Sequence, residues 1–436
     1  MLYNTLSAPI TAQVELTTGC DNDCMYCYNH WRHDKNVPGA NMHRDLLDKV
    51  IQELLENHVF QVTFTGGEVL LRKEELFYGL EKLIRGGVSC AVNSNLTLLT
   101  AEKAKRLYDL GLRGIMTSIS SHQSNLHDYI SHRQGAYEKT MRGIHNAQEA
   151  GLFVAVSMVV TTLNAHQVYE TGKAMQALGI REFYATKASP PVNASGFKQY
   201  LLSKKQLQTV LEDLYRLKEE SGIEVGVLEC YPLCGHGEPE RFSFVSDRRC
   251  SAGITTCTIG ADGNVRPCSH SEKEYGNIAS DGLKLAWQRM TDQRDGSLLP
   301  RICQDCDLLP HCSGGCRVDA LCCNGSYDSL DPYASPEKIA AIEVPSRIIP
   351  TTLPEGTCLR INKSLRTRKE SFGVLCASDE TMAMPALLTD DTYTLLETFG
   401  QSEFTAKQIA DQTGASLQDA DALCAMLLRD KVITTT

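Results

Sequence analysis

The stretch that decides the fold is Glu15-Leu-Thr-Thr-Gly-Cys20-Asp-Asn-Asp-Cys24-Met-Tyr-Cys27-Tyr-Asn-His30. It places three cysteines at the spacing C-x3-C-x2-C directly after a short extended run. Three thiolates on one loop can hold three corners of a 4Fe-4S cluster and leave the fourth iron open. An open iron can bind a substrate or cofactor, whereas a fully ligated cluster usually only transfers electrons. The alternative is a structural zinc knuckle, which usually needs a second cysteine pair close by, and none follows before Cys90.

A second motif follows at Gly66-Gly67-Glu68, where a strand-like run ends in two glycines and an acid. The flexible backbone of such a turn can bind an ammonium group closely. Together, the cysteine loop and this turn resemble the radical S-adenosylmethionine (SAM) superfamily. The resemblance implies that Cys20, Cys24 and Cys27 hold a 4Fe-4S cluster. It also implies that SAM is bound by the residues Tyr26, Gly66, Gly67 and Glu68.

Composition excludes several other classes of protein. The chain has 436 residues, a net charge of -10 and a sequence pI near 5.7, which argues against binding nucleic acid by broad phosphate neutralisation. The N-terminus lacks a basic start followed by an apolar core, and no run of about eighteen apolar residues occurs. We therefore expect a cytoplasmic protein. In a reducing cytosol, its 18 cysteines indicate metal ligands and not disulfides.

Residues 1–222 alternate short apolar runs with amphipathic stretches, which predicts strand-helix units on a parallel sheet. The expected strands are 12–18, 60–65, 89–94, 114–120, 153–161 and 182–187. The expected helices are 43–57, 73–86, 101–111, 136–151, 165–179 and 203–221. Six such units match the partial (β/α)6 barrel of radical SAM enzymes, an α/β fold in which the chemistry lies at the carboxyl ends of the strands.

Residues 223–343 lose this alternation and are rich in Cys, Gly, Asp and Pro, so metal ligation is the expected source of their order. The spacing C-x2-C-x5-C-x3-C over 303–316, preceded by further cysteines, resembles the SPASM extension of peptide-modifying radical SAM enzymes. That resemblance implies two auxiliary 4Fe-4S clusters. Auxiliary cluster I would be held by Cys250, Cys257, Cys268 and Cys316. Auxiliary cluster II would be held by Cys303, Cys306 and Cys312. A zinc ribbon is the alternative.

The sequence departs from the SPASM pattern where the last ligand of auxiliary cluster II belongs. The family places a cysteine after Asp-Pro-x, and here the residue is Ala334. Either Cys322 or Cys323 substitutes, which we favour, or the cluster keeps an open iron. Cys230 and Cys234 lie outside the pattern, as spare ligands or ordinary thiols. The cysteines in apolar surroundings are expected in cores: Cys90, Cys358, Cys376 and Cys424.

Four further positions are candidates around the cofactor. Asn93 and Ser118 end the third and fourth strands where relatives bind SAM, although the usual acid two residues after Ser118 is a serine here. Arg133 suits the SAM carboxylate as a planar cation, or is a solvated loop charge. His270 could take a proton during radical oxidation, or be a loop histidine without a chemical role.

A Pro-rich linker over 344–357 precedes a last domain at 358–436. This domain shows two strand-like runs near 359–367 and 372–377 and helices near 390–400, 405–412 and 416–429. A DNA-binding winged helix would be basic, but residues 403–431 carry more acids than bases. The order of elements instead resembles the RiPP recognition element, a winged-helix-like α+β module that binds the leader of a ribosomally made precursor peptide as an extra strand. The strand pair at 359–377 would offer the edge. A plain packing or dimerisation domain is the alternative.

The resemblances imply a radical SAM oxidoreductase that modifies a ribosomal precursor peptide. The reaction expected is oxidative crosslinking after hydrogen abstraction by a 5'-deoxyadenosyl radical, with flavodoxin or ferredoxin as electron donor. A sulfatase-maturing or small-molecule radical SAM dehydrogenase is the alternative among enzymes. An iron-sulfur regulator that binds DNA is the alternative from another class.

Overall fold

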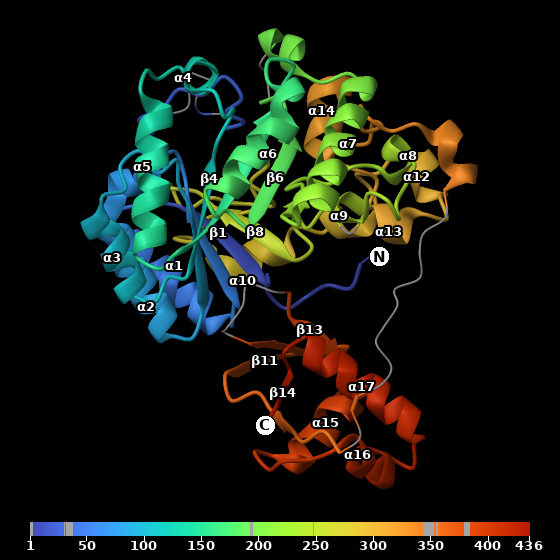
Figure 1. Ribbon diagram of the computed structural model, residues 1–436. Coiled ribbons are helices and arrows are strands. Elements are labelled where there is room, and N and C mark those ends of the chain that lie inside the picture. The colour runs from blue at the N-terminus through green and yellow to red at the C-terminus, as the bar shows by residue number, and fades with distance from the viewer. Residues whose placement is uncertain are drawn as a thin grey trace.

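The computed structural model describes residues 3–29, 31, 38–191, 195–246, 248–342, 353–354, 356–378 and 384–436. Figure 1 shows a large lobe, which contains the sheet and the Cys-rich region, and a small lobe below it formed by the C-terminal residues. None of the helices in the described part is long and apolar enough to cross a membrane. The arrangement confirms the predicted fold class.

The large lobe is built on a sheet of nine strands in the order β7-β6-β5-β4-β3-β2-β1-β8-β9. Every pairing is parallel except the last, in which β9 runs antiparallel to β8. The strands are β1 (Thr11–Glu15), β2 (Gln61–Thr65), β3 (Ser89–Asn93), β4 (Gly114–Ser118), β5 (Phe153–Val160), β6 (Glu182–Lys187), β7 (Glu224–Gly226), β8 (Thr256–Ile259) and β9 (Val265–Arg266). Because β1 to β7 are consecutive and parallel, the loops after them meet at one end of the sheet.

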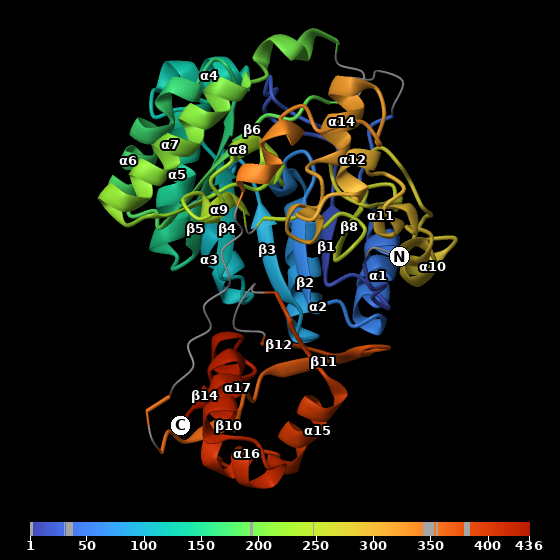
Figure 2. The same cartoon turned by 90° about the vertical axis from the view of Figure 1, so that its right-hand side faces the viewer.

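Helices connect these strands and cover the outer side of the curved sheet (Figure 2). They are α1 (Arg44–Glu56), α2 (Lys73–Arg85), α3 (Ala101–Asp109), α4 (Ser124–Ser131), α5 (Ala136–Glu149), α6 (Val168–Ala177) and α7 (Lys204–Ser221). Helix α7 shows how local sequence sets them, because Ser203 and Gln206 form a capping box at its start and Gly222 ends it in a left-handed conformation. Its leucines and Val210 recur at helical spacing and are buried against the sheet.

The Cys-rich region folds as short helices around the β8–β9 pair. These are α8 (Leu233–His236), α9 (Ser243–Ser246), α10 (Gly282–Gln288), α11 (Asp292–Asp295), α12 (Arg301–Gln304), α13 (Leu309–Cys312) and α14 (Arg317–Asn324). Around α8 the apolar cluster of buried residues is small, consisting of Cys234, Ala334 and Ile342. Other parts of the region, such as Phe242, Ile278 and Trp287, are buried in the core of the large lobe. Metal ligation is therefore expected to add to the order of the part around α8.

The C-terminal domain has its own core and differs in detail from the predicted strands. Its elements are β10 (Leu359–Ile361), β11 (Leu365–Glu370), β12 (Gly373–Ser378), β13 (Ala386–Leu388), α15 (Asp390–Phe399), α16 (Ala406–Thr413), α17 (Leu417–Arg429) and β14 (Ile433–Thr435). The predicted run 359–367 is not one strand, because β10 pairs with β14 while β11 belongs to a separate sheet in the order β11-β12-β13. Cys358, expected in a core, is exposed.

Two arginines of β11 attach this domain to the end of the barrel where the strands begin. The Arg366 guanidinium donates to the carbonyls of Val59, Phe60 and Gly87 at 3.2, 3.4 and 2.8 Å. The buried Arg368 guanidinium donates to the carbonyls of Ala8 and Pro9 at 2.7 and 2.9 Å. These carbonyls precede β1, β2 and β3, so the domain lies opposite the loops that follow the strands (Figure 2).

We expect Arg368→Leu to loosen this docking without unfolding either lobe. The change leaves buried carbonyls without donors and Glu370 without its ion pair at 2.8 Å, and each unsatisfied group costs about 1–3 kcal/mol. Hydrogen exchange should become faster in peptides spanning 7–10 and 57–61 and stay unchanged in α16 and α17. Lys369→Leu is the matched control, because exposed Lys369 pairs within its own domain with Asp390. Equal exchange in the two variants would contradict the docking role.

Candidate functional site

The loop with Cys20, Cys24 and Cys27 follows β1 at the carboxyl end of the sheet, and all three thiols are half-buried. The end of α4 holds this loop, because Asp23 N donates to Ser131 O at 3.0 Å and Met25 N donates to Ile130 O at 2.9 Å. Helix α4 was not predicted from the sequence. The backbone of the cysteine loop is thus fixed by a neighbouring helix.

Gly66 and Gly67 let the turn after β2 pack directly on the start of the cysteine loop. Gly66 has a φ of +138°, and a Cβ on Gly67 would lie 2.0 Å from Gly19 O. Gly67 N donates to Thr17 O at 2.7 Å, and Glu68 N donates to Gly19 O at 2.8 Å. No side chain larger than glycine fits this approach. The two motifs that the sequence singled out are therefore in direct contact.

The Glu68 side chain is fully buried and positions the next loop. Its carboxylate accepts hydrogen bonds from Leu70 N, Ser94 Oγ and Asn95 N at 2.9, 2.7 and 2.8 Å. Burial, only partly offset by these donors, raises the pKa of Glu68 to about 7. The carboxylate thus joins the loops after β2 and β3. Binding of SAM by this turn stays a prediction.

The loop after β3 reaches the cysteine loop through polar side chains. Asn95 Nδ2 donates to Asp21 Oδ1 at 2.8 Å and lies 3.9 Å from Cys20 Sγ, and Thr97 Oγ1 donates to Asp21 Oδ2 at 2.5 Å. Asn95 was not among the predicted site residues. Its place two residues after the end of β3 is the signal that could have found it.

Asn93 and Ser118, the predicted SAM contacts, are the half-buried last residues of β3 and β4. Within the described residues, neither side chain makes a hydrogen bond. Nearby, His127 Nδ1 accepts from Ser120 N at 3.1 Å, while its buried Nε2 has no partner. Unsatisfied polar groups at the carboxyl end of a parallel sheet fit a bound polar cofactor. Arg133 lies beyond them with an exposed side chain, so its role stays a prediction.

His270 lies beside the cysteine loop. Its ring is 3.8 Å from that of Tyr28, centroid to centroid, and its Nδ1 is 3.1 Å from Glu229 Oε1. Tyr28 follows Cys27 directly, and Tyr26, in the same loop, is half-buried. The structure therefore places the candidate base close to the predicted SAM cluster and gives it a carboxylate partner that sequence analysis missed.

A buried charge network continues from Glu229 to the end of β6. The fully buried Lys187 Nζ lies 2.8 Å from Glu229 Oε2 and also pairs with Asp319. Burial alone would raise the pKa of Glu229, but Lys187 and His270 outweigh it and lower that pKa. The rings of Tyr231 and Tyr333 flank the ammonium, with centroids 5.3 and 5.4 Å from Nζ. The network connects the barrel to the Cys-rich region.

One group of four thiols lies next to this network. The Cys230 thiol lies beside those of Cys250 and Cys316, and Cys268 is close to the same two. Cys257, which resemblance assigned to this group, is instead in the barrel core on β8, aligned with Ala12. Burial raises the pKa of its thiol to about 12. The structure thus does not bring Cys257 to this group, and its assignment to auxiliary cluster I stays a prediction.

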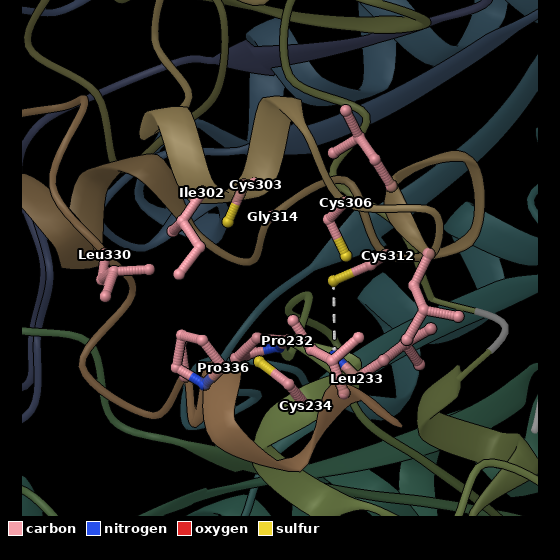
Figure 3. Close-up of a pocket in the computed structure, with 14 residues that line it drawn as sticks. Pro232, Leu233, Cys234, Ile302, Cys303, Cys306, Cys312, Gly314, Leu330 and Pro336 are labelled. Atoms are coloured by element: carbon pink, nitrogen blue, oxygen red, sulfur yellow. Dashed lines mark hydrogen bonds between the residues drawn. The ribbon is translucent and has the colours of Figure 1, made fainter. Parts of the chain in front are cut away.

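A second group of four thiols lines a cavity that is partly open to solvent. Figure 3 shows Cys303, Cys306 and Cys312 on one side of it and Cys234 on the other. Cys322 and Cys323, expected to complete this set, are not among the lining residues. They lie on α14, with Asp319 as their strongest ionisable neighbour. The structure thus does not bring this pair to the cavity, and its role as a ligand stays a prediction.

The chemistry of both groups fits clusters better than single ions. Within the described residues, no three His, Cys, Asp or Glu side chains converge on one metal ion, as a zinc ribbon would require. In a 4Fe-4S cluster each thiolate binds a different iron, so its ligands surround a larger volume. Four thiols around a cavity with Leu, Ile and Pro walls match that requirement.

Comparison with known proteins gives the family of these sites. Residues 14–175 match the radical SAM superfamily, and residues 250–307 match SPASM, an iron-sulfur cluster-binding domain. The chain carries a radical SAM domain and a SPASM domain. This confirms the expected enzyme class, and with it SAM and 4Fe-4S clusters as cofactors. The C-terminal domain lies outside both matches.

Two relatives and one solved structure show the range of this radical SAM/SPASM enzyme's similarities. AdoMet-dependent heme synthase of Nitratidesulfovibrio vulgaris is 25% identical over 340 residues, covering 74% of this chain and 90% of that protein. PqqA peptide cyclase of Methylocella silvestris is 25% identical over 358 residues, which cover 77% of this chain and 90% of that protein. Streptococcus suis SuiB bound to the precursor peptide SuiA has a TM-score of 0.60 and 19% identity, covering 75% of this chain and 76% of SuiB.

Proposed function

We propose that this radical SAM/SPASM enzyme modifies a ribosomally synthesised precursor peptide, whose leader binds the C-terminal domain. The observation that carries the proposal is a small α+β domain outside the matched families, docked on the barrel, whose sheet has an open strand edge. Peptide substrates are also named for relatives such as PqqA peptide cyclase and for SuiB. The finer expectation is an oxidative crosslink, with flavodoxin or ferredoxin as electron donor.

Both outer strands of this sheet, β11 and β13, lack a second partner among the described strands. We place the peptide on β13 and not on the 359–377 pair expected from the sequence. Strand β13 pairs with β12 on one side, and no described strand pairs with its other side. The outer strand β11 is instead held against the barrel by Arg366 and Arg368. Met384, just before β13, is 56% exposed, and Leu387, within β13, is 50% exposed. A free edge with exposed apolar side chains suits an extended peptide that adds as a strand.

The cofactor end of the barrel suits removal of hydrogen from such a peptide. When bound, SAM and its cluster supply a 5'-deoxyadenosyl radical that abstracts a substrate hydrogen atom. His270, stacked on Tyr28 and held by Glu229, lies where it could accept the proton that a net oxidation also releases. The SPASM thiols lie beyond Glu229, where auxiliary clusters could accept the second electron.

The test is the mass of a small peptide encoded beside the gene after anaerobic co-expression with the enzyme. A loss of about 2 Da per event that is absent with Cys24→Ala would support oxidative crosslinking. An unchanged mass, confirmed in deuterated solvent to exclude epimerisation, would contradict peptide modification. Since heme synthase is among the relatives, purified enzyme is also offered a tetrapyrrole, and turnover of it alone would favour that second function.

We expect Leu387→Glu to weaken binding of the labelled leader at least tenfold in an anaerobic fluorescence polarisation titration. A charge on the edge strand removes an apolar contact and must be desolvated when the peptide adds, and tenfold corresponds to about 1.4 kcal/mol. Leu178→Glu is the matched control, because Leu178 is a similarly exposed leucine on the barrel, with 42% exposure. Equal affinities of the two variants would exclude β13 as the docking edge.

A further inference from the structure

The segment that runs from β7 into α8 contains two cysteines that neither family motif explains. Cys230 and Cys234 are separated by three residues, and both are buried. Each completes a different group of thiols in the SPASM region. The sequence pattern provides three members of each group, and this segment provides the fourth.

Cys234 occupies the place left by the missing cysteine at position 334. Its Sγ accepts a hydrogen bond from Ser335 N at 3.3 Å, and its side chain packs with Ala334 in one apolar cluster. The thiol faces the same cavity as Cys303, Cys306 and Cys312 (Figure 3). The neighbouring Leu233 N donates to Cys312 Sγ at 3.3 Å, which ties this segment to the other side of the cavity. The Cys234 thiol, from earlier in the chain, thus lies where the missing cysteine at position 334 would place its own thiol.

Cys230 completes the other group in the same way. Its thiol lies beside those of Cys250 and Cys316, whereas Cys257 lies among apolar side chains of the barrel. Residues on both sides fix its position. Glu229 accepts hydrogen bonds from Lys187 and Ser189, at 2.8 and 2.7 Å, and Lys187 N donates to Tyr231 Oη at 2.9 Å. The segment is thereby held rigidly between the end of β6 and the two groups of thiols.

We propose that Cys230 is the fourth ligand of auxiliary cluster I and Cys234 the fourth ligand of auxiliary cluster II. A single stretch of five residues then joins the two clusters. Both clusters have four protein ligands, so neither presents an open iron to a substrate. This inference concerns the cofactors alone and does not depend on a peptide being the substrate.

The test for auxiliary cluster II measures iron, sulfide and the EPR spectrum of the reduced, anaerobically reconstituted enzyme. Cys234→Ala should lose up to about four irons per chain, or keep a cluster whose EPR signal changes with its ligand. Adding Ala334→Cys should restore both readouts, since position 334 lies beside Cys234. The rescue separates loss of a ligand from general misfolding. Full iron and an unchanged spectrum in Cys234→Ala would overturn the assignment.

Two controls complete the design. The double variant Cys322→Ala, Cys323→Ala should keep its full iron content, because the pair lies outside the cavity. For auxiliary cluster I, Cys230→Ala should change the iron content or EPR spectrum, while Cys257→Ala should change neither. The reverse result in either pair would return the ligand to the residue that resemblance first indicated.

Discussion

Cys24→Ala is expected to abolish cleavage of SAM and to remove about four of about twelve irons per chain. Cys24 is the middle of three thiols on a loop held by the turn at Gly66-Gly67, by Asn95 and by α4. With only two thiolates left on this loop, the cluster that activates SAM is no longer held. The measurement is anaerobic formation of 5'-deoxyadenosine together with iron content after reconstitution.

Cys90→Ala is the matched control for this loss. Cys90 is a buried thiol of β3 whose side chain lies in the barrel core and not at the cofactor end. It should retain all its iron and its SAM cleavage, with a modest loss of stability from the smaller side chain. SAM cleavage that survives in Cys24→Ala would contradict the placement of the radical SAM cluster on this loop.

Lys187→Met is expected to lower stability by about 3–5 kcal/mol, because it leaves buried carboxylates without their cation. Glu229 and Asp319 both contact the Lys187 ammonium, and none of the three side chains is more than 12% exposed. Methionine is close in length, so the packing between Tyr231 and Tyr333 is largely kept. The measurement is the thermal unfolding midpoint of the anaerobic holoenzyme.

The loss of stability caused by Lys187→Met should depend on pH in a definite direction. Without Lys187, the buried carboxylates bind protons more readily in the folded chain than in the unfolded chain, so folded stability rises as pH falls. The difference from wild type should therefore be larger at pH 8 than at pH 5.5. Lys205→Met, at an exposed position of α7, should change the midpoint little at either pH. A Lys187→Met defect no larger than that of Lys205→Met would show that the network does not stabilise the fold.

The barrel could be predicted closely because its signals are local. Helix α7 is marked by a capping box, a regular apolar face and a terminal glycine, and the predicted range 203–221 differs from α7 by one residue at its start. The short elements β7 and β13 were missed, since three residues carry too little periodicity to be recognised. The break between β10 and β11 was also missed, because it depends on pairing with β14 at the far end of the chain.

The candidate site was predictable where its residues follow one another in sequence and not where the fold gathers them. The motif at Cys20, Cys24 and Cys27 is contiguous. By contrast, Lys187 meets Glu229 and Asp319 across separations of 42 and 132 residues. Cys234 lies about a hundred residues before Ala334, whose place it takes. No spacing in the sequence indicates contacts between residues so far apart in the chain. The sequence therefore favoured the nearer cysteines, Cys322 and Cys323, as the last ligand of auxiliary cluster II.

Docking of the C-terminal domain at the start of the barrel strands sets a minimum distance between a leader bound at β13 and the cofactor. The cysteine loop lies at the other end of β1, and a strand of five residues spans about 16 Å. A leader held at β13 must therefore be followed by at least about five extended residues before any residue can reach the cofactor, and by more if the peptide follows the outside of the barrel. Residues closer to the leader than this are out of reach whatever their chemistry. Lengthening or shortening that spacer in the substrate would then move the position that is modified.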